Sequence, residues 1–253
     1  RQESSLASTT SGATPLRVQV GLDVLKAEGF ARLKGKKVGL LANPAACCSD
    51  YRHLVDHCLD HSVDVVRLYG PEHGIFGDAQ YMEGVETTKD RRTGVDVVSL
   101  YGDTRESLML DPKDLDGVEV LVCDLQDIGT RYYTFAYTIA FALRAAAVAG
   151  TDVLVLDRPN PLGGVTLEGN VVEDAYRSFV GEYPLMTRHG LTLGELVHYF
   201  AEQDHIHDRL RLDVVWMDGY DRNAFGHECD APWVMPSPNM PTHQTALVYP
   251  GGC

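Results

Sequence analysis

Short apolar runs alternate with stretches of helical periodicity along most of this chain. The apolar runs are rich in β-branched residues and end at Gly, Pro or polar residues, which is typical of buried strands. The pattern predicts strands at residues 38–42, 63–68, 95–100, 118–123, 153–156 and 212–216. It predicts helices at residues 51–61, 137–149 and 192–203.

Nearly continuous apolar strands that alternate with helices indicate a parallel sheet covered on both faces. We therefore expect a Rossmann-like, doubly wound α/β domain with a mostly parallel sheet over residues 21–235. Residues 1–20 begin with a segment rich in Ser, Thr, Ala and Gly and are expected to be a leader or linker. After about Asp218 the periodicity fades and proline becomes more frequent, which suggests a connection toward a further region.

Charge and composition exclude several classes of protein. The 253 residues contain 22 Lys and Arg against 36 Asp and Glu, which gives a net charge of −14. Such an acidic chain is poorly suited to bind nucleic acid through a broad basic surface. Apolar runs stay below the roughly 18–20 residues that span a bilayer. The six cysteines lack a C-x-x-C pair, and we expect most of them to be reduced and buried.

Polar side chains concentrate directly after three of the predicted strands. The carboxyl ends of parallel strands meet at one edge of a sheet, where ligands bind in doubly wound folds. The three segments are residues 70–77, 124–133 and 157–164. We expect them to bring together Glu72, His73, Asp124, Asp127, Arg131, Asp157, Arg158, Asn160 and the nearby Glu168.

Several carboxylates around one cleft suit the cleavage of a glycosidic bond, which commonly needs an acid and a second carboxylate. Glu72 is the candidate acid, although it could equally be a solvated turn residue or the partner of an arginine. Asp124 and Asp157 could instead cap helices or pair with Arg131 and Arg158.

Two other patterns point away from cofactor chemistry. His53, His57 and His61 recur every four residues, as zinc ligands on one helix face can. Acidic residues between them favour a solvated polar face, so we expect no metal there. The chain lacks a G-x-G-x-x-G motif and a phosphate-loop lysine, so we expect no nucleotide cofactor. It also lacks the G-x-S-x-G motif of serine hydrolases.

A set of longer motifs occurs in a fixed order along the chain. They are Gly70-Pro71-Glu72-His73-Gly74, Asp124-x-Gln126-Asp127-x-Gly129-x-Arg131-x-Tyr133-Thr134, Asp157-Arg158-Pro159-Asn160-Pro161-Leu162-Gly163-Gly164, His189-Gly190-x-Thr192 and Trp233-x-x-Pro236-Ser237-Pro238-Asn239. Together they resemble the NamZ-type exo-β-N-acetylmuramidases, glycoside hydrolase family 171, once known only as a domain of unknown function. The resemblance runs from about Gly21 to the end of the chain.

The resemblance implies a bacterial, cofactor-free glycosidase of cell-wall turnover. Such an enzyme releases N-acetylmuramic acid from the non-reducing end of peptidoglycan fragments, and is often exported to the periplasm or the extracellular space. Glu72 matches the family's catalytic glutamate, and Glu168 is the second catalytic candidate. The residues expected to bind substrate are His73, Asp124, Gln126, Asp127, Arg131, Tyr133, Arg158, Asn160 and Asn239.

Two other functions use the same residues. One is a non-catalytic protein that binds muropeptides or sugars in the cleft. The other is a metal-assisted hydrolase that uses His73 with Asp124 or Asp127. Members of the family have a smaller C-terminal domain after the Rossmann-like one, so the resemblance implies that residues 236–253 start a truncated C-terminal domain. The family continues beyond the Tyr-Pro-Gly stretch at residues 249–251, so we expect part of the cleft to come from residues after Cys253.

Overall fold

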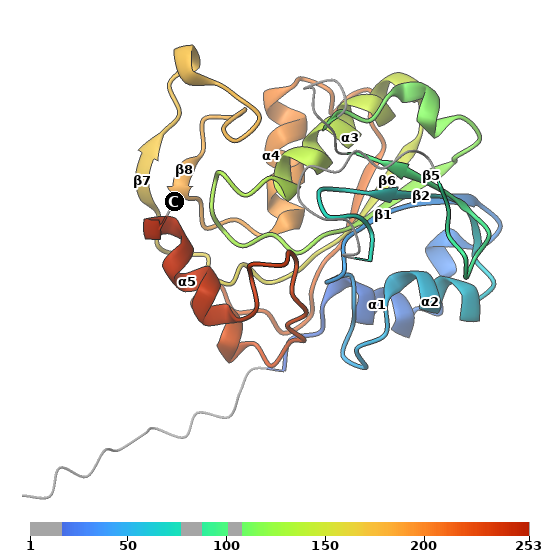
Figure 1. Cartoon of the computed structure of the whole chain (residues 1–253), viewed down its shortest axis with the longest axis horizontal. Coiled ribbons are helices and arrows are strands. Elements are labelled where there is room, and N and C mark those ends of the chain that lie inside the picture. Colours follow the sequence, from blue (N-terminus) through green and yellow to red (C-terminus); the bar gives the residue numbers. More distant parts are fainter. Residues whose placement is uncertain (1–16, 77–87, 101–107, 253) are drawn as a thin grey trace, which may run out of the picture.

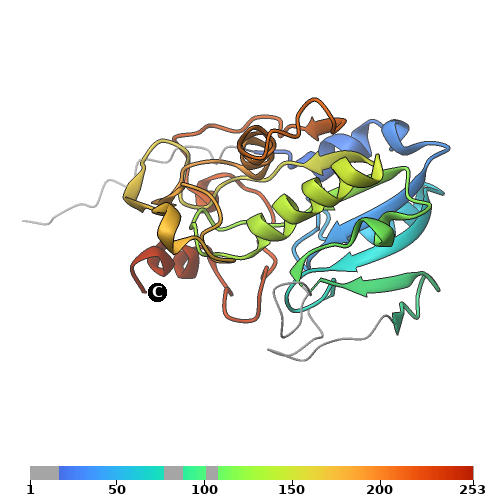
Figure 2. The same ribbon diagram turned by 90° about the horizontal axis from the view of Figure 1, so that it is seen from above.

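The computed structural model describes residues 17–76, 88–100 and 108–252. A central sheet carries helices on both faces (Figures 1 and 2). Six parallel strands lie in the order β4-β2-β1-β5-β6-β9, and a short antiparallel strand, β3, pairs with β4 at the edge. The strands are β1 (Lys37–Ala42), β2 (Asp64–Gly70), β3 (Thr88–Lys89), β4 (Asp96–Ser99), β5 (Val120–Asp124), β6 (Asp152–Leu156) and β9 (Leu212–Val215).

The strand order confirms the predicted doubly wound fold. The chain builds β1, β2 and β4 toward one edge, then returns to the other side of β1 and adds β5, β6 and β9. This reversal creates the topological switch point between β1 and β5, where ligands bind in this class of fold. Each predicted strand and helix matches an observed element, the helices being α2 (Leu54–Asp60), α3 (Phe135–Ala149) and α4 (Leu193–Gln203).

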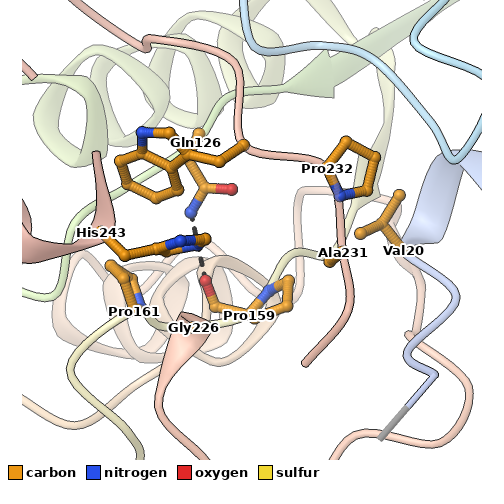
Figure 3. A pocket seen from close by; sticks show the side chains of 9 residues that line it. Val20, Gln126, Pro159, Pro161, Gly226, Ala231, Pro232 and His243 are labelled. Atoms are coloured by element: carbon orange, nitrogen blue, oxygen red, sulfur yellow. Dashed lines mark hydrogen bonds between the residues drawn. The ribbon is translucent and has the colours of Figure 1, made fainter. Parts of the chain in front are cut away.

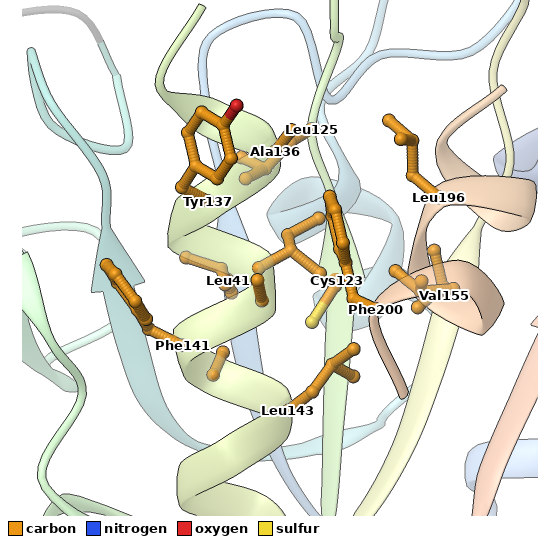
Figure 4. Packing of buried hydrophobic residues seen from close by; sticks show 14 of the residues in the cluster. Leu41, Cys123, Leu125, Ala136, Tyr137, Phe141, Leu143, Val155, Leu196 and Phe200 are labelled. Atoms are coloured by element: carbon orange, nitrogen blue, oxygen red, sulfur yellow. The ribbon is translucent and has the colours of Figure 1, made fainter. Parts of the chain in front are cut away.

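The alternation of side chains along the strands divides the core into two layers. Leu40 faces the layer with α1 (Gly21–Ala27) and α2, whereas Leu41 faces the layer with α3 and α4. Figure 4 shows Leu41 packed with Cys123, Val155 and the ring of Phe200 from α4. Burial of each such side chain contributes about 1.5–3 kcal/mol. Because both faces are covered, the strand sequences are apolar throughout.

The described structure extends past the predicted domain boundaries at both ends. Val18 and Val20 are buried, and Gln19 forms a bridge with Asp218, so the last residues of the predicted leader pack on the fold. Residues 1–16 lie outside the described structure. At the other end, helix α5 (His243–Gly252) packs against the α3 layer through Ala246. Residue 253 lies outside the described structure.

The histidines of α2 do not form the predicted solvated face. His53 caps the helix by accepting the Val55 amide at 3.3 Å and is largely buried. His57 is 1% exposed. Only His61 of the three is exposed, because the histidine side of this short helix faces the ring of Phe30 and the loop after β1.

The five described cysteines are all buried and free. Among the described residues, no helix has both the length and the apolar character that crossing a membrane requires.

Asp157, at the end of β6, holds the beginning of α4 in place. Its carboxylate accepts the Gly194 amide at 2.8 Å and the Thr192 hydroxyl at 3.1 Å. Thr192 is also the N-cap of α4 and forms a capping box with Glu195. Burial raises the pKa of Asp157 to about 6, although the two hydrogen bonds act in the opposite direction.

The variant Asp157→Asn is therefore expected to change how stability depends on pH. An aspartate in the unfolded chain has a pKa of about 3.9, so the folded state binds more protons between pH 4 and pH 6. As pH rises through this range, the free energy of unfolding of the native chain therefore falls. The asparagine of the variant has no charge to bury and keeps an oxygen that accepts the Gly194 amide. Urea unfolding should show the variant gaining about 2–3 kcal/mol relative to the native chain between pH 4 and pH 7.

The exposed Asp64→Asn variant, at the start of β2, provides the background pH dependence. A constant difference between Asp157→Asn and the native chain across this range would contradict the prediction.

Candidate functional site

The segment after β2 forms a tight turn that fixes Glu72 at the edge of the sheet. The Gly74 amide donates to the Pro71 carbonyl at 2.9 Å. His73 and Gly74 both have left-handed backbones, with φ of 71° and 78°. This conformation is costly for a histidine and persists only where surrounding contacts enforce it, a condition frequent at functional sites.

Glu72 lies at the beginning of α3. Its Oε2 accepts the hydroxyl of Thr134, the N-cap residue of α3, at 3.0 Å. Its Oε1 lies 3.8 Å from Nε2 of His73, and its side chain is 17% exposed. The N-terminus of a long helix carries partial positive charge and stabilises a negative charge nearby. Glu72 therefore lies at the positive end of the α3 dipole.

A pocket of about 280 Å³ opens beside this turn. Its volume is close to the lower end of the range for small-molecule sites, about 300–1,000 Å³. Tyr133 donates its hydroxyl to Oγ of Ser237 in the wall of the pocket at 3.0 Å, and burial raises the pKa of Tyr133. The pocket is lined by Pro44, His73, Phe76, Val234, Met235, Pro236, Ser237 and Pro238.

Asp124 and Arg158 form a buried ion pair. Both oxygens of Asp124 accept from the guanidinium, and Nη2 of Arg158 also donates to the Cys47 carbonyl at 2.9 Å. The two residues are 0% and 2% exposed. Asp124 is therefore the partner of an arginine, which was one of the two roles that the sequence allowed, and not a helix cap. The contacts link the loops after β1, β5 and β6 rather than open into solvent.

Gln126 and Asn160 also use their polar groups inside the fold. Gln126 donates to the carbonyl of Asp127 at 2.6 Å. It also donates to the carbonyl of Pro159 at 3.1 Å (Figure 3). The cavity beside Gln126 has only about 10 Å³, room for one water molecule and not for a sugar. Asn160 accepts the Leu162 amide and donates to the Leu191 carbonyl, each at 2.9 Å.

Asp127 retains a polar atom without a hydrogen bond. Its Oδ2 accepts the Gly129 amide at 2.6 Å and lies 3.2 Å from Nε2 of His189. Nδ1 of His189 accepts the Leu191 amide at 3.2 Å, so the ring is a neutral tautomer that donates from Nε2. Among the described residues, Oδ1 of Asp127 is buried and has no partner. It lies inside the fold, and Asp127 is not among the residues that line the pocket.

The second catalytic candidate lies on a separate two-stranded sheet made of β7 (Glu168–Val171) and β8 (Met186–Arg188). Glu168 is exposed and pairs with Arg188 at 2.8 Å. Arg188 also forms a backbone bridge with Thr130 and donates to the Leu162 carbonyl. Glu168 is thereby attached to the loops that follow β5 and β6.

Arg131 and Asn239 differ from the buried residues. The guanidinium of Arg131 is half-buried and donates to the Asn170 carbonyl and, at 2.9 Å, to the Leu185 carbonyl. Within the described part of the chain these acceptors are neutral, and none of them is a carboxylate that would pair with its charge. Asn239 is exposed, beside the segment that lines the pocket.

The sequence reasoning did not single out Thr134, His189 and Ser237 as site residues. Each occurs in a motif quoted above, but only the fold shows which neighbour each one contacts. For a metal, the described residues contain one group of three close ligands, Cys48, Asp50 and His57, whose ligand atoms lie within 4.8 Å of one another. The residues of the metal-assisted alternative, His73 with Asp124 or Asp127, do not form such a group.

Comparisons with known proteins identify relatives over most of the chain. The family model described as "Exo-beta-N-acetylmuramidase NamZ, N-terminal" matches residues 38–244. The curated protein "Peptidoglycan beta-N-acetylmuramidase NamZ" of Bacillus subtilis (strain 168) is 43% identical over 235 residues, which cover 92% of this chain and 56% of that protein. The chain thus spans little more than half the length of this relative.

Two solved structures of DUF1343 family proteins from Bacteroides fragilis NCTC 9343 share the fold. One has a TM-score of 0.84 and 38% identity and the other a TM-score of 0.75 and 28% identity. The matches cover 92% of this chain in both cases, and 59% and 60% of the respective solved chains. From the family match over residues 38–244 and the identity to the curated relative, the chain belongs to the NamZ family.

Proposed function

We propose that this chain is the α/β part of an exo-acting glycosidase that releases N-acetylmuramic acid from the non-reducing end of peptidoglycan fragments. The observation that carries the proposal is the position of Glu72. It lies at the beginning of α3 and next to His73, which lines the pocket, in a chain of the NamZ family. The substrate belongs to the bacterial cell wall, so we place the protein outside the cytoplasm, where it acts in cell-wall turnover.

Glu72 acts as the general acid in this proposal. Its carboxyl group gives a proton to the glycosidic oxygen as the bond from that oxygen to the anomeric carbon breaks. Thr134 orients the carboxyl group, and α3 stabilises the carboxylate that remains. The anomeric carbon is then attacked by a water molecule, by Glu168, or by the acetamido group of the substrate itself. The carboxylate then takes a proton from the water that completes hydrolysis.

We divide the predicted substrate-binding residues into two groups by their contacts. Three of them remain accessible to a ligand: His73 lines the pocket, Arg131 is half-buried and Asn239 is exposed. The others are buried and hydrogen-bonded within the protein, so we assign them to positioning the loops: Asp124, Gln126, Asp127, Tyr133, Arg158 and Asn160.

Replacement of the catalytic acid gives the central test of this function. Glu72→Gln in the full-length protein should lower kcat/KM for a muramic-acid-ended disaccharide by about 10²–10⁴-fold, the usual contribution of a general acid. An aryl N-acetylmuraminide with a good leaving group needs less protonation, so its loss should be much smaller. Rates are measured by product analysis for the disaccharide and by release of the aryl alcohol.

Glu173→Gln, an exposed carboxylate outside the pocket, is the matched control and should keep native rates. Equal losses on both substrates would assign Glu72 to nucleophilic attack instead of acid catalysis. Full turnover by Glu72→Gln would refute a catalytic role. Tight sugar binding without product from the native protein would favour the non-catalytic alternative.

Arg131 is expected to bind the lactyl carboxylate that distinguishes N-acetylmuramic acid from N-acetylglucosamine. Among residues 17–76, 88–100 and 108–252 its hydrogen-bond acceptors are neutral, whereas the charge of Arg158 is neutralised by Asp124. Arg131→Gln should raise KM about tenfold or more for substrates with the lactyl acid, as loss of a charged hydrogen bond of about 1.5–3 kcal/mol implies.

The control is Arg177→Gln, whose exposed guanidinium pairs with Asp174 on the connection between β7 and β8. It should leave KM unchanged. An equal rise in KM for analogues that lack the lactyl group would rule out the assignment of Arg131.

A further inference from the structure

We propose that Cys48, Asp50 and His57 form a zinc-binding site that fastens the loop after β1 to helix α2. Cys48 and Asp50 belong to this loop, residues 43–53, and His57 lies on the following helix. This group is outside the pocket and takes no part in the hydrolysis proposed above.

Three potential ligand atoms converge on one point. Sγ of Cys48, Oδ1 of Asp50 and Nε2 of His57 are each 3.2 Å from the other two. Oδ1 of Asp50 also accepts the Arg52 amide at 2.9 Å. The Cys48 thiol and Nε2 of a protonated His57 ring supply at most two hydrogens to the three contacts. One of these close contacts is therefore left without a hydrogen of its own, while a cation at the centre would be bound by all three atoms.

The triangle has the size that zinc needs. Its centre lies about 1.8 Å from each atom, slightly less than the Zn–N, Zn–O and Zn–S distances of about 2.0–2.3 Å. An ion placed a little above the plane reaches all three atoms. Tetrahedral coordination requires the ligand atoms to move apart by only a few tenths of an ångström.

The donor set and its surroundings favour Zn²⁺ in particular. One thiolate, one imidazole and one carboxylate are ligands that zinc accepts, whereas Mg²⁺ and Ca²⁺ prefer oxygen alone. Cys48 is 0% and His57 1% exposed, so two ligands are fixed by packing. The side chain of Asp50 is 35% exposed, which gives the ion a path from solvent and leaves room for a water as the fourth ligand.

Lys26 does not block the site, because it uses the other oxygen of the carboxylate. Its Nζ lies 2.6 Å from Oδ2 of Asp50, which orients Oδ1 toward the cysteine and the histidine. Such outer contacts commonly hold metal-binding carboxylates. Asp23 lies close by and accepts from the Ser49 amide at 3.0 Å. The charges of Zn²⁺ and Lys26 balance those of the Cys48 thiolate, Asp50 and Asp23, and the thiol proton leaves to solvent.

The position of the group gives the metal a structural role. The same loop carries Pro44, which lines the pocket beside His73, and Cys47, whose carbonyl binds Arg158. A bound ion would link this loop to α2 through side chains only ten residues apart in sequence. We expect zinc to rigidify the back of the pocket and to stabilise the fold.

The test uses the intact, tag-free protein after removal of metal by chelation. Zn²⁺ titrated by calorimetry should bind with a stoichiometry of one, and Co²⁺ should give a thiolate-to-cobalt charge-transfer band. Zinc at a hundredfold excess over Kd should raise Tm by about 5 °C or more. Cys48→Ser and His57→Gln should weaken Zn²⁺ binding at least tenfold, and the serine variant should lose the band.

Matched controls are available within the same elements. Cys47→Ser removes a neighbouring thiol that contacts the Pro44 carbonyl, and His61→Gln removes a histidine one turn further along α2. Both should bind Zn²⁺ as the native protein does. If a buried substitution prevents folding, Asp50→Asn tests the same site, because it alters the ligand that is partly exposed.

Absence of saturable binding by the native protein would overturn the proposal. Zn²⁺ affinity that persists in Cys48→Ser and His57→Gln would overturn it too, since the ion would then be adventitious. Neither result bears on the glycosidase function, because Glu72 and its test on the disaccharide do not involve this group.

Discussion

The buried ion pair between Arg158 and Asp124 connects the parts of the molecule on which the site depends. Asp124 ends β5, Arg158 follows β6, and the same guanidinium reaches the Cys47 carbonyl in the loop after β1. Burial of two charges is costly, and such a pair adds little net stability. The pair instead fixes how the loops are arranged, because any arrangement that separated the two partners would leave an unpaired charge in the core. The three loops at the switch point can therefore close in only one arrangement.

The same edge of the sheet carries two groups of polar residues, one that holds the loops together and one that faces the pocket. Loops tied together by Arg158, Gln126 and Asn160 form a rigid base, and that base leaves Glu72 and the pocket free to meet a ligand. Catalytic groups must be held to within about 0.5 Å, and buried partners accomplish this better than mobile surface contacts do. The buried polar residues near the site thus act through the loops they hold, while the half-buried and exposed residues remain accessible to a ligand.

The sheet could be predicted from the sequence because strands buried on both faces leave continuous apolar runs, as Val120–Asp124 shows. The convergence of Glu72 with the segment after β5 followed from the parallel order. Partners could not be predicted in this way, since Asp124 was equally suited to a helix cap or an arginine. Strand β7 escaped notice because it is exposed throughout, and α5 because Pro250 and the glycines after it indicate a turn. The acidic residues between the histidines of α2 suggested a solvated face, yet His53 and His57 are buried.

The net charge of −14 acquires a different meaning once the local geometry is known. An anionic sugar acid is repelled by an acidic surface only within about 8 Å at physiological salt, because ions screen more distant charges. A guanidinium at about 4 Å in a half-buried site interacts with a carboxylate by about 4 kcal/mol, several times more than any screened surface charge. Arg131 is the residue that we propose for this interaction, because it is half-buried and its hydrogen-bond acceptors are neutral carbonyls. At that distance one arginine would outweigh the acidity of the whole surface in recognition of the proposed substrate.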